Sequence, residues 1–427
     1  MADMAMQAAI MFAQRNDALH RQYSVGPAIH TAPQGAVPDG SMIIADVFSP
    51  TSPGDKFSHG EMVKMAATQN GFRGPTFTTS TDPNMELGLQ TSRAESGFFD
   101  PRATPEQTPA NVATVAGNNA LSLLQGQTRM VEGATASGAK NSVLNMSSGG
   151  SHAATTGRLY FTAAAAWEPS VDPQVKASGL TVASNLASAY GLSVDKLTSS
   201  DPKVSGPERA RLQSALMNGV KEGVDGNAAV AQAKNQYTTA VGRFESNRNS
   251  VVVAAGNEGE TLEAMKKDAH GHSPQNIPAD FNTNYLDTPE ATMVGATRWS
   301  ENGNGLKESV AGYSNSNAGV DVHASGSLST NGGNAADAHG TSFAAPRVAA
   351  TMATLHRLNP KMTSSQVEHL MKQSLTNPLN DGGGQVSVLD FQKSSDMNVN
   401  HAPQPSAPFS FAPVLNSVGT PLTSPLY

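Results

Sequence analysis

The chain has 427 residues, enough for one large domain with appendages or for two or three smaller domains. Hydrophobic residues make up 38% and charged residues 15%, a composition typical of a globular protein with polar loops. The net charge of −7 is spread without a long run of one sign, which argues against nucleic acid or a membrane surface as a partner. No apolar run approaches the roughly 20 residues needed to cross a bilayer.

The absence of cysteine excludes disulfides, a cysteine nucleophile and thiolate metal sites, but it does not fix the compartment. The N-terminus has Asp3 where a secretory signal has lysine or arginine, and the apolar run between Gln7 and Gln14 is too short for such a signal. We therefore expect a protein that is either cytoplasmic or exported by a route without a cleaved signal, for example as an effector acting on host proteins.

The first part of the chain predicts an extension followed by a strand and a helix. Residues 1–38 form an N-terminal extension and linker, with a short amphipathic helix expected near Met4 to His20. Residues 41–48 form a buried strand that contains Asp46 near its end, and a helix opens at His59. Residues 70–110 are polar and irregular, and no element is assigned to them.

The middle of the chain predicts further alternation of helix and strand. An amphipathic helix over 118–139 leads into a strand that starts at Ser142 and ends in a Ser/Gly loop at 147–150. Residues 155–245 are rich in alanine and mostly helical, with breaks expected at Pro202 and Pro207, and the clearest helix covers 227–244.

The last part of the chain continues the same pattern. Strands are expected from Ser250, over 291–297 and near 320–322, and helices over 343–357 and 363–371, the latter with a possible capping box from Ser365 to Glu368. Residues 396–427 form a Pro/Ser-rich tail that is expected to be disordered or extended. Strands alternating with helices favour an α/β fold with a largely parallel sheet.

Four polar residues at predicted element ends could carry chemistry. They are an acid, an imidazole, an amide and a hydroxyl: Asp46, His59, Asn257 and Ser342. Ligands bind outside the carboxyl ends of the strands in open α/β sheets, so such a fold could bring these groups together. A serine becomes a good nucleophile when a base accepts its proton and an acid orients that base. Each residue alone also fits a structural role, as a strand end, helix start, turn or N-cap.

Ser342 lies in the stretch from His339 to Pro346, where a helix is predicted to begin. Gly340 would let the backbone turn sharply, and Pro346 falls within about the first helical turn, where a missing N–H costs little. Free backbone N–H groups and the positive end of the helix dipole collect at such a terminus, which suits a developing oxyanion.

Five strings, in the same order along the chain, resemble motifs of the subtilisin-like serine proteases, or subtilases. They are Ile43-Ile44-Ala45-Asp46, His59-Gly60 with Val63 and Ala66, Val143 to Gly150, Val251 to Gly259, and Gly340 to Pro346. The resemblance implies a three-layer, doubly wound fold with a largely parallel sheet and helices on both faces. It also implies a serine endopeptidase that acts on protein or peptide substrates without a cofactor or catalytic metal.

The resemblance also implies roles for particular residues. Asp46, His59 and Ser342 would form the catalytic triad, and Asn257 would supply the oxyanion side chain. A second set would bind substrate: Ser147, Ser148 and Gly149 would pair with its backbone, and Ala254, Ala255 and Gly256 would edge the pocket for the residue before the scissile bond.

The chain departs from the usual subtilase pattern in three places. Asp46 is followed by Val47-Phe48 instead of Ser/Thr-Gly, and only thirteen positions separate Asp46 from His59. The distance from Gly150 to Val251 is much longer than is typical, which predicts a helical insertion at about 155–245 within a peptidase domain spanning 39–395. Such an insertion beside the cleft could act as a lid or contact a partner.

Other readings of the sequence remain open at this point. His339 lies three positions before Ser342 and could rival His59 as the base, although packing or hydrogen bonding on the strand that enters the nucleophile turn is the expected role. Asp268, His270 and His272 resemble a metal cluster but are expected to lie in a solvated loop. A catalytically inactive subtilase fold that binds proteins through the insertion or the tail is the alternative function. The base of the specificity pocket could not be assigned.

Overall fold

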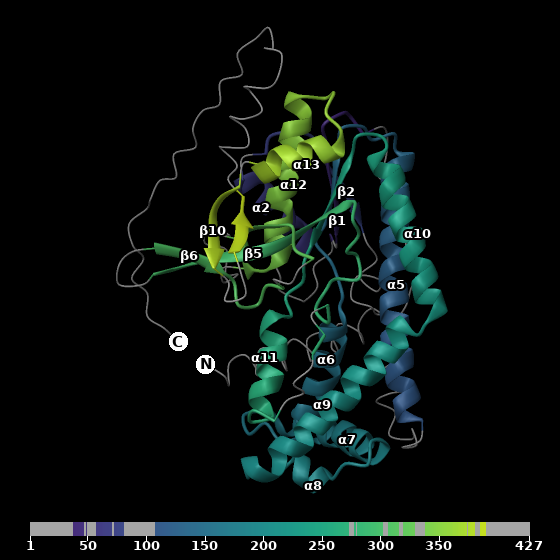
Figure 1. The fold of residues 1–427 in the computed structure, drawn as a ribbon, viewed down its shortest axis with the longest axis vertical. Coiled ribbons are helices and arrows are strands. Elements are labelled where there is room, and N and C mark those ends of the chain that lie inside the picture. The colour runs from purple at the N-terminus through teal and green to yellow at the C-terminus, as the bar shows by residue number, and fades with distance from the viewer. Residues whose placement is uncertain are drawn as a thin grey trace.

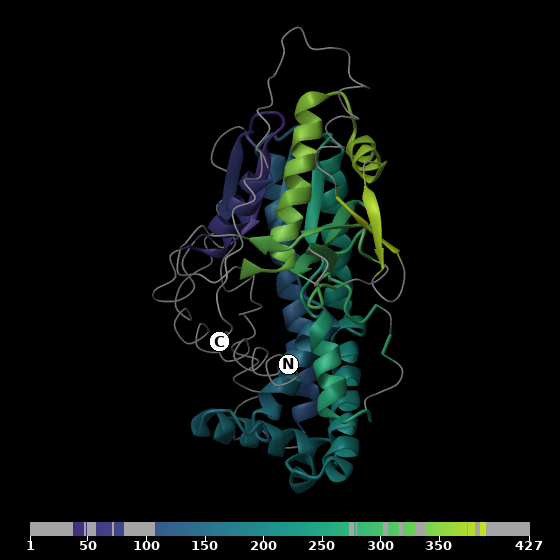
Figure 2. The ribbon, with the colours of Figure 1, turned by 90° about the vertical axis from the view of Figure 1, so that its left-hand side faces the viewer.

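The computed structural model describes residues 37–46, 48, 57–70, 72–80, 107–272, 277–278, 280–301, 306–315, 319–328, 338–373, 375–380 and 385–389. The helix expected near Met4 to His20 and the tail from residue 396 lie outside these residues. The described chain forms a large sheet with helices on both faces and further helices beyond one end of it (Figures 1 and 2).

The large sheet has nine strands in the order β10-β11-β7-β5-β4-β3-β1-β2, with β6 paired to β5 outside this path. Neighbours from β11 to β2 pair in parallel, whereas β5–β6 and β10–β11 are antiparallel. The strands are β1 (Met42–Asp46), β2 (Thr76–Ser80), β3 (Val143–Met146), β4 (Ser250–Ala254), β5 (Ala291–Glu301), β6 (Leu306–Val310), β7 (Val322–Ser325), β10 (Thr376–Asn380) and β11 (Gln385–Val388).

One face of the sheet is covered by α2 (His59–Gln69), α12 (Thr341–Leu358) and α13 (Ser364–Gln373). Helix α12 packs across the centre of the sheet, where its buried Val348 and Met352 meet strand residues such as Val252. Because β1, β3 and β4 are buried on both faces, their sequences are nearly continuous apolar runs.

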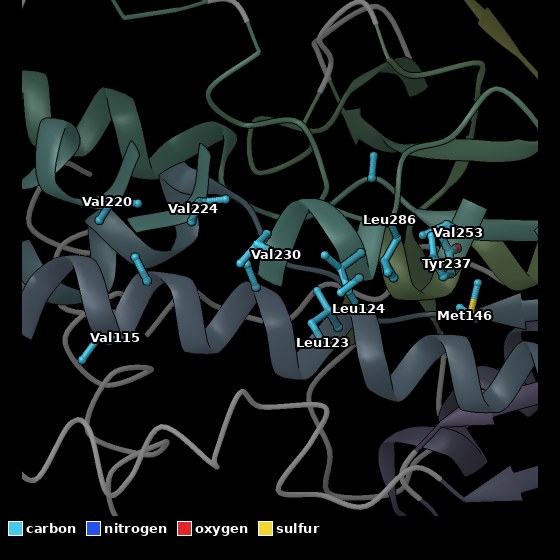
Figure 3. Close-up of a cluster of buried hydrophobic side chains, with 14 of the residues drawn as sticks. Val115, Leu123, Leu124, Met146, Val220, Val224, Val230, Tyr237, Val253 and Leu286 are labelled. Carbon is cyan, nitrogen blue, oxygen red and sulfur yellow. The ribbon is translucent and has the colours of Figure 1, made fainter. Parts of the chain in front are cut away.

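The opposite face is covered by α5 (Thr108–Ala136) and α10 (Ala228–Glu245), whose core also includes residues of α6 (His152–Ala164) and α11 (Gly259–Asp268) beyond the end of the sheet (Figure 1). Figure 3 shows side chains of this core, where Leu124 of α5 and Tyr237 of α10 lie with Met146 of β3 and Val253 of β4. With helices on both faces of a mostly parallel sheet, the expected doubly wound α/β class is confirmed.

The segment between β3 and β4 is helical, as expected. It comprises α6, α7 (Pro173–Ala189), α8 (Val194–Leu197), α9 (Pro202–Asp225) and α10, and α7 to α9 lie beyond the end of the sheet (Figures 1 and 2). All five helices begin where a side-chain oxygen accepts a bond from a nearby backbone N–H, at Ser151, Asp172, Ser193, Asp201 and Asn227. Val220 and Val224 of α9 belong to the same core as the sheet residues, so the insertion and the sheet share one apolar core (Figure 3).

Local details differ from the sequence prediction. The predicted break at Pro207 is wrong, since this proline lies inside α9, whereas Pro202 does start that helix. The helix expected over 118–139 begins earlier, at Thr108. The capping box of α13 is formed by Thr363 and Gln366, not by Ser365 and Glu368. Among the described residues no helix is both long and apolar enough to cross a membrane.

Candidate active site

The carboxyl ends of β1, β3 and β4 lie side by side in the sheet, and the N-terminus of α12 meets them there. The register pairs Ala45 with Met146 and Met146 with Val253, so the residues that follow each strand are neighbours. Asp46 ends β1, Ser147 follows β3, and the loop to Asn257 follows β4. The parallel sheet thus brings together residues that are distant in the sequence.

Asp46 and His59 form a hydrogen-bonded pair. The Nδ1 of His59 lies 2.7 Å from Oδ1 of Asp46, whose side chain is fully buried, while the His59 side chain is 31% exposed. A capping box between Ser58 and Glu61 fixes the start of α2 and therefore the position of His59. The buried carboxylate accepts a hydrogen bond from the Nδ1–H group, which leaves Nε2 as the basic nitrogen of the neutral ring.

Ser342 is the second residue of α12, at the helix N-terminus as predicted. The rings of His59 and Phe343 lie 5.9 Å apart between centroids, so the imidazole adjoins the residue that follows Ser342. The Ser342 hydroxyl donates to the carbonyl oxygen of Ser147 at 3.0 Å and not to His59. The hydroxyl of Ser147 donates in return to the Ser342 carbonyl at 2.9 Å.

A buried asparagine on β3 supports this contact and was not predicted. The Nδ2 of Asn145 donates to the Ser147 hydroxyl at 2.9 Å, and the Asn145 side chain is fully buried. A polar residue inside an otherwise apolar strand was the available signal, because buried polar groups normally have a specific partner.

Asn257 faces the start of α12 from the loop after β4. Its Oδ1 accepts from the backbone N–H of Thr341 at 2.9 Å and from the Thr341 hydroxyl at 3.1 Å. Since the oxygen is occupied, Nδ2 is the end of the amide that can donate to a ligand. A Cβ built on Gly340 would lie 3.5 Å from this Nδ2 and 3.7 Å from the Ser342 nitrogen. Two N–H donors therefore lie close together beside Gly340.

The backbone at Gly340 is extended, with φ of 166°, so the sharp glycine turn expected there is not present. Any residue can adopt this conformation. What glycine provides at this position is the absence of a side chain beside the Nδ2 of Asn257 and the N–H of Ser342. Gly256 does have a left-handed backbone, with φ of 109°, and its N–H donates to the Thr341 hydroxyl at 3.2 Å. Thr341 therefore connects the loop after β4 to α12.

The predicted substrate-binding segments lie at the carboxyl ends of two paired strands. Ser147, Ser148 and Gly149 follow β3, and Ala254 to Gly256 end and follow β4. The hydroxyl of Ser148 accepts from Nε2 of Gln127 at 2.8 Å. A Cβ on Gly149 would lie 2.0 Å from Nδ2 of Asn284, a residue that the sequence did not single out.

A carboxyl group lies behind Gly256. A Cβ on Gly256 would be 2.4 Å from Oε2 of Glu258 and 2.5 Å from Nδ2 of Asn315. Burial raises the pKa of the Glu258 carboxyl, and a hydrogen bond of 2.6 Å from Asn315 opposes this shift. Neither residue was predicted.

The other histidine candidates lie apart from these groups. His339 is on β9 (Ala338–His339), where its Nδ1 lies 3.2 Å from the hydroxyl of Ser327 on β8 (Ser327–Leu328); the strand position and the hydrogen bond are as expected, and the side chain is exposed. His270 and His272 are exposed, but Asp268 is buried and bonded to Arg209, so its expected place in a solvated loop is wrong. Within the described ranges, no group of three or more potential metal-binding side chains is found.

A parallel α/β sheet that carries a serine, a histidine–aspartate pair and amide donors at its strand ends is characteristic of serine hydrolases. The Subtilase family profile matches residues 110–392, which is more than half of the chain. The chain therefore belongs to the subtilase family, whose members are serine-type peptidases. The matched range contains Asn257 and Ser342, while Asp46 and His59 precede it.

Three solved structures illustrate the range of similarity. A lanthipeptide protease is 13% identical with a TM-score of 0.38, over 84% of this chain and 87% of that one. A protease from Pseudoalteromonas arctica is 22% identical with a TM-score of 0.26, over 38% and 47% of the two chains. The A-subunit of the AB5 toxin from E. coli is 21% identical with a TM-score of 0.27, over 39% and 56%. A search of curated proteins gave no match.

Proposed function

We propose that this subtilase is a serine endopeptidase in which Ser342 is the nucleophile, His59 the general base and Asp46 its orienting acid. The observation that carries the proposal is the 2.7 Å pair between buried Asp46 and His59, with the imidazole next to Phe343 at the start of α12. The pair holds the ring in the tautomer whose Nε2 can accept a proton from a hydroxyl.

The first half of the reaction forms an acyl-enzyme. The Ser342 hydroxyl would leave the Ser147 carbonyl, transfer its proton to Nε2 of His59 and attack the scissile carbonyl carbon. The oxygen of that carbonyl would become an anion and accept hydrogen bonds from Nδ2 of Asn257 and the Ser342 N–H. Imidazolium would then protonate the leaving amine as the carbon–nitrogen bond breaks.

The second half releases the acyl group. A water molecule would give a proton to His59 and attack the acyl carbon, and the collapse of the second tetrahedral state would return that proton to Ser342. The segments after β3 and β4 would bind the substrate chain, with Ser147 to Gly149 on one side and Ala254 to Gly256 on the other. In support, both segments lie at the carboxyl ends of neighbouring parallel strands.

A fluorophosphonate probe tests the proposal, because only a serine activated by a base in a formed oxyanion site reacts with it readily. The probe should label the wild type, and Ser342→Ala should abolish labelling and peptide hydrolysis. Ser178→Ala is the matched control, since this exposed serine lies on α7 away from the site and its loss should leave labelling unchanged. A folded wild type that stays unlabelled would contradict the proposal.

A further inference from the structure

The two segments proposed to border the substrate cleft are bridged by the side chain of Asn284. Its Nδ2 donates to the Ala254 carbonyl at 2.7 Å, and the same nitrogen would lie 2.0 Å from a Cβ on Gly149. There is thus no room for even a methyl group between Gly149 and this amide. The Asn284 side chain spans the gap between the segments after β3 and β4.

The amide of Asn284 is held at both ends. Its Oδ1 accepts from the backbone N–H of Leu286 at 2.9 Å while Nδ2 bonds to Ala254, and the residue is 3% exposed. Displacing the amide would leave a buried N–H and a buried carbonyl without partners, and such groups are costly to leave unpaired. The bridge is therefore a fixed boundary and not a side chain that moves aside easily.

The segment around Asn284 is hydrogen-bonded both to the loop after β3 and to the insertion. The N–H of Tyr285 donates to the Gly150 carbonyl at 2.8 Å, and the N–H of Ala153 donates to the Phe281 carbonyl at 2.9 Å. From α10, Nζ of Lys234 donates to the Tyr285 carbonyl at 2.6 Å and to the Asp287 carbonyl. The insertion thus supports the segment that closes the gap.

We propose that Asn284 forms the floor of the pocket for the residue on the amino side of the scissile bond, so that the enzyme cleaves after small uncharged residues such as glycine, alanine and serine. This inference rests on the proposed function. A side chain that enters between the two segments meets the Asn284 amide, and Glu258 and Asn315 make the space behind Gly256 polar as well. A large apolar side chain finds neither depth nor an apolar surface there.

The test uses quenched peptides that differ only in the residue before the scissile bond: glycine, alanine, serine, leucine, phenylalanine or lysine. For the wild type, kcat/KM with alanine should exceed that with leucine or phenylalanine by at least about 100-fold, since a pocket discriminates strongly against groups it cannot hold. Asn284→Ser shortens the floor while keeping an acceptor for Leu286, and it should raise kcat/KM for leucine at least about tenfold. Asn235→Ala, an exposed asparagine of α10, should keep the wild-type profile.

Each outcome has a separate meaning when active sites are titrated with the fluorophosphonate probe. A labelled wild type that prefers leucine or phenylalanine would overturn the pocket inference and leave the proposed function intact. A folded and labelled Asn284→Ser with an unchanged alanine-to-leucine ratio would also overturn it. A folded wild type without labelling or hydrolysis would overturn the proposed function and the inference together. Should Asn284→Ser fail to fold, the wild-type profile alone decides.

Discussion

Replacement of Asp268 by asparagine should strongly destabilise the fold, because this carboxylate of α11 is the centre of a buried polar cluster whose other members lie in the insertion. It accepts from Nη1 of Arg209 at 2.8 Å, from Nε1 of Trp167 at 3.1 Å and from the hydroxyl of Tyr160. The side chains of the Arg209–Asp268 pair are only 8% and 4% exposed, and the guanidinium lies 4.7 Å from the centre of the Trp167 ring.

The expected loss of unfolding free energy follows from the buried charge that the substitution leaves without a partner. Asparagine keeps the shape of Asp268 but removes its charge, so Arg209 remains buried with its positive charge uncompensated. Breaking a buried ion pair in this way typically costs about 3–5 kcal/mol, compared with about 0–1 kcal/mol for a surface pair. Tyr160→Phe removes one hydrogen bond to a charged acceptor and should cost about 1.5–3 kcal/mol. Removing both charges, with Asp268→Leu and Arg209→Met, should recover part of the loss.

Urea unfolding measures these changes, and Ser342→Ala is the suitable background because it removes the proposed nucleophile and so should prevent self-cleavage during the titration. Trp167 is one of two tryptophans in the chain and lies in the cluster, so its fluorescence reports the transition directly. The unfolding free energy of each variant is compared with that of the background protein. A loss below about 1 kcal/mol for Asp268→Asn would show that the pair is solvated and would refute the reasoning.

Three further predictions concern the site and the pH dependence. His59→Ala should abolish labelling and hydrolysis, whereas His339→Ala should retain most of both; the reverse result would reassign the base. Asn257→Ala should lower kcat by about 10²–10³-fold with little change in KM, whereas a purely structural role would lower the melting temperature and leave the kcat of the folded fraction nearly unchanged. Burial raises the pKa of Glu245 from 4.5 to about 7, so stability should fall as the pH rises through this interval, and urea midpoints of Glu245→Gln should lack that component.

The central strands and the nucleophile helix could be predicted from sequence because their signals are local. The strands β1, β3 and β4 are continuous apolar runs, and α12 has apolar residues at helical spacing from Phe343 to Leu355. In contrast, β6, β10 and β11 were missed, since none of them is a continuous apolar run. Strands β6 and β10 form by antiparallel pairing with the adjacent β5 and β11, and β11 also pairs with the distant β7. Pro207 gave a misleading signal because the packing of α9 against α5 and α6 outweighs the loss of one hydrogen bond.

The residues of the site also differ in how far the sequence predicts them, because some stand in local motifs and others depend on contacts between distant positions. Asp46, His59, Asn257 and Ser342 stand in recognisable strings, and the structure places the first two in direct contact. Asn284 could not be found from sequence, because its amide bonds to Ala254, thirty positions earlier, and no local pattern marks that pairing. The contact of Asn315 with the Ala255 carbonyl is of the same kind. Asn145 differs, because it bonds to the nearby Ser147 and its polar side chain stands out in an apolar strand.

The placement of the insertion between β3 and β4 has a consequence for the order in which the protein folds. Val143 and Ser250 are direct partners in the sheet although they are 107 positions apart in the chain. Closing so long a loop of disordered chain costs entropy before any strand contact forms, and prior folding of α6 to α10 shortens that loop. We therefore expect the segments after β3 and β4 to meet late, after the insertion helices have formed, and Ser342 can join them only when the chain has been made well beyond β4. If the proposed function holds, the growing chain therefore has no assembled active site during synthesis.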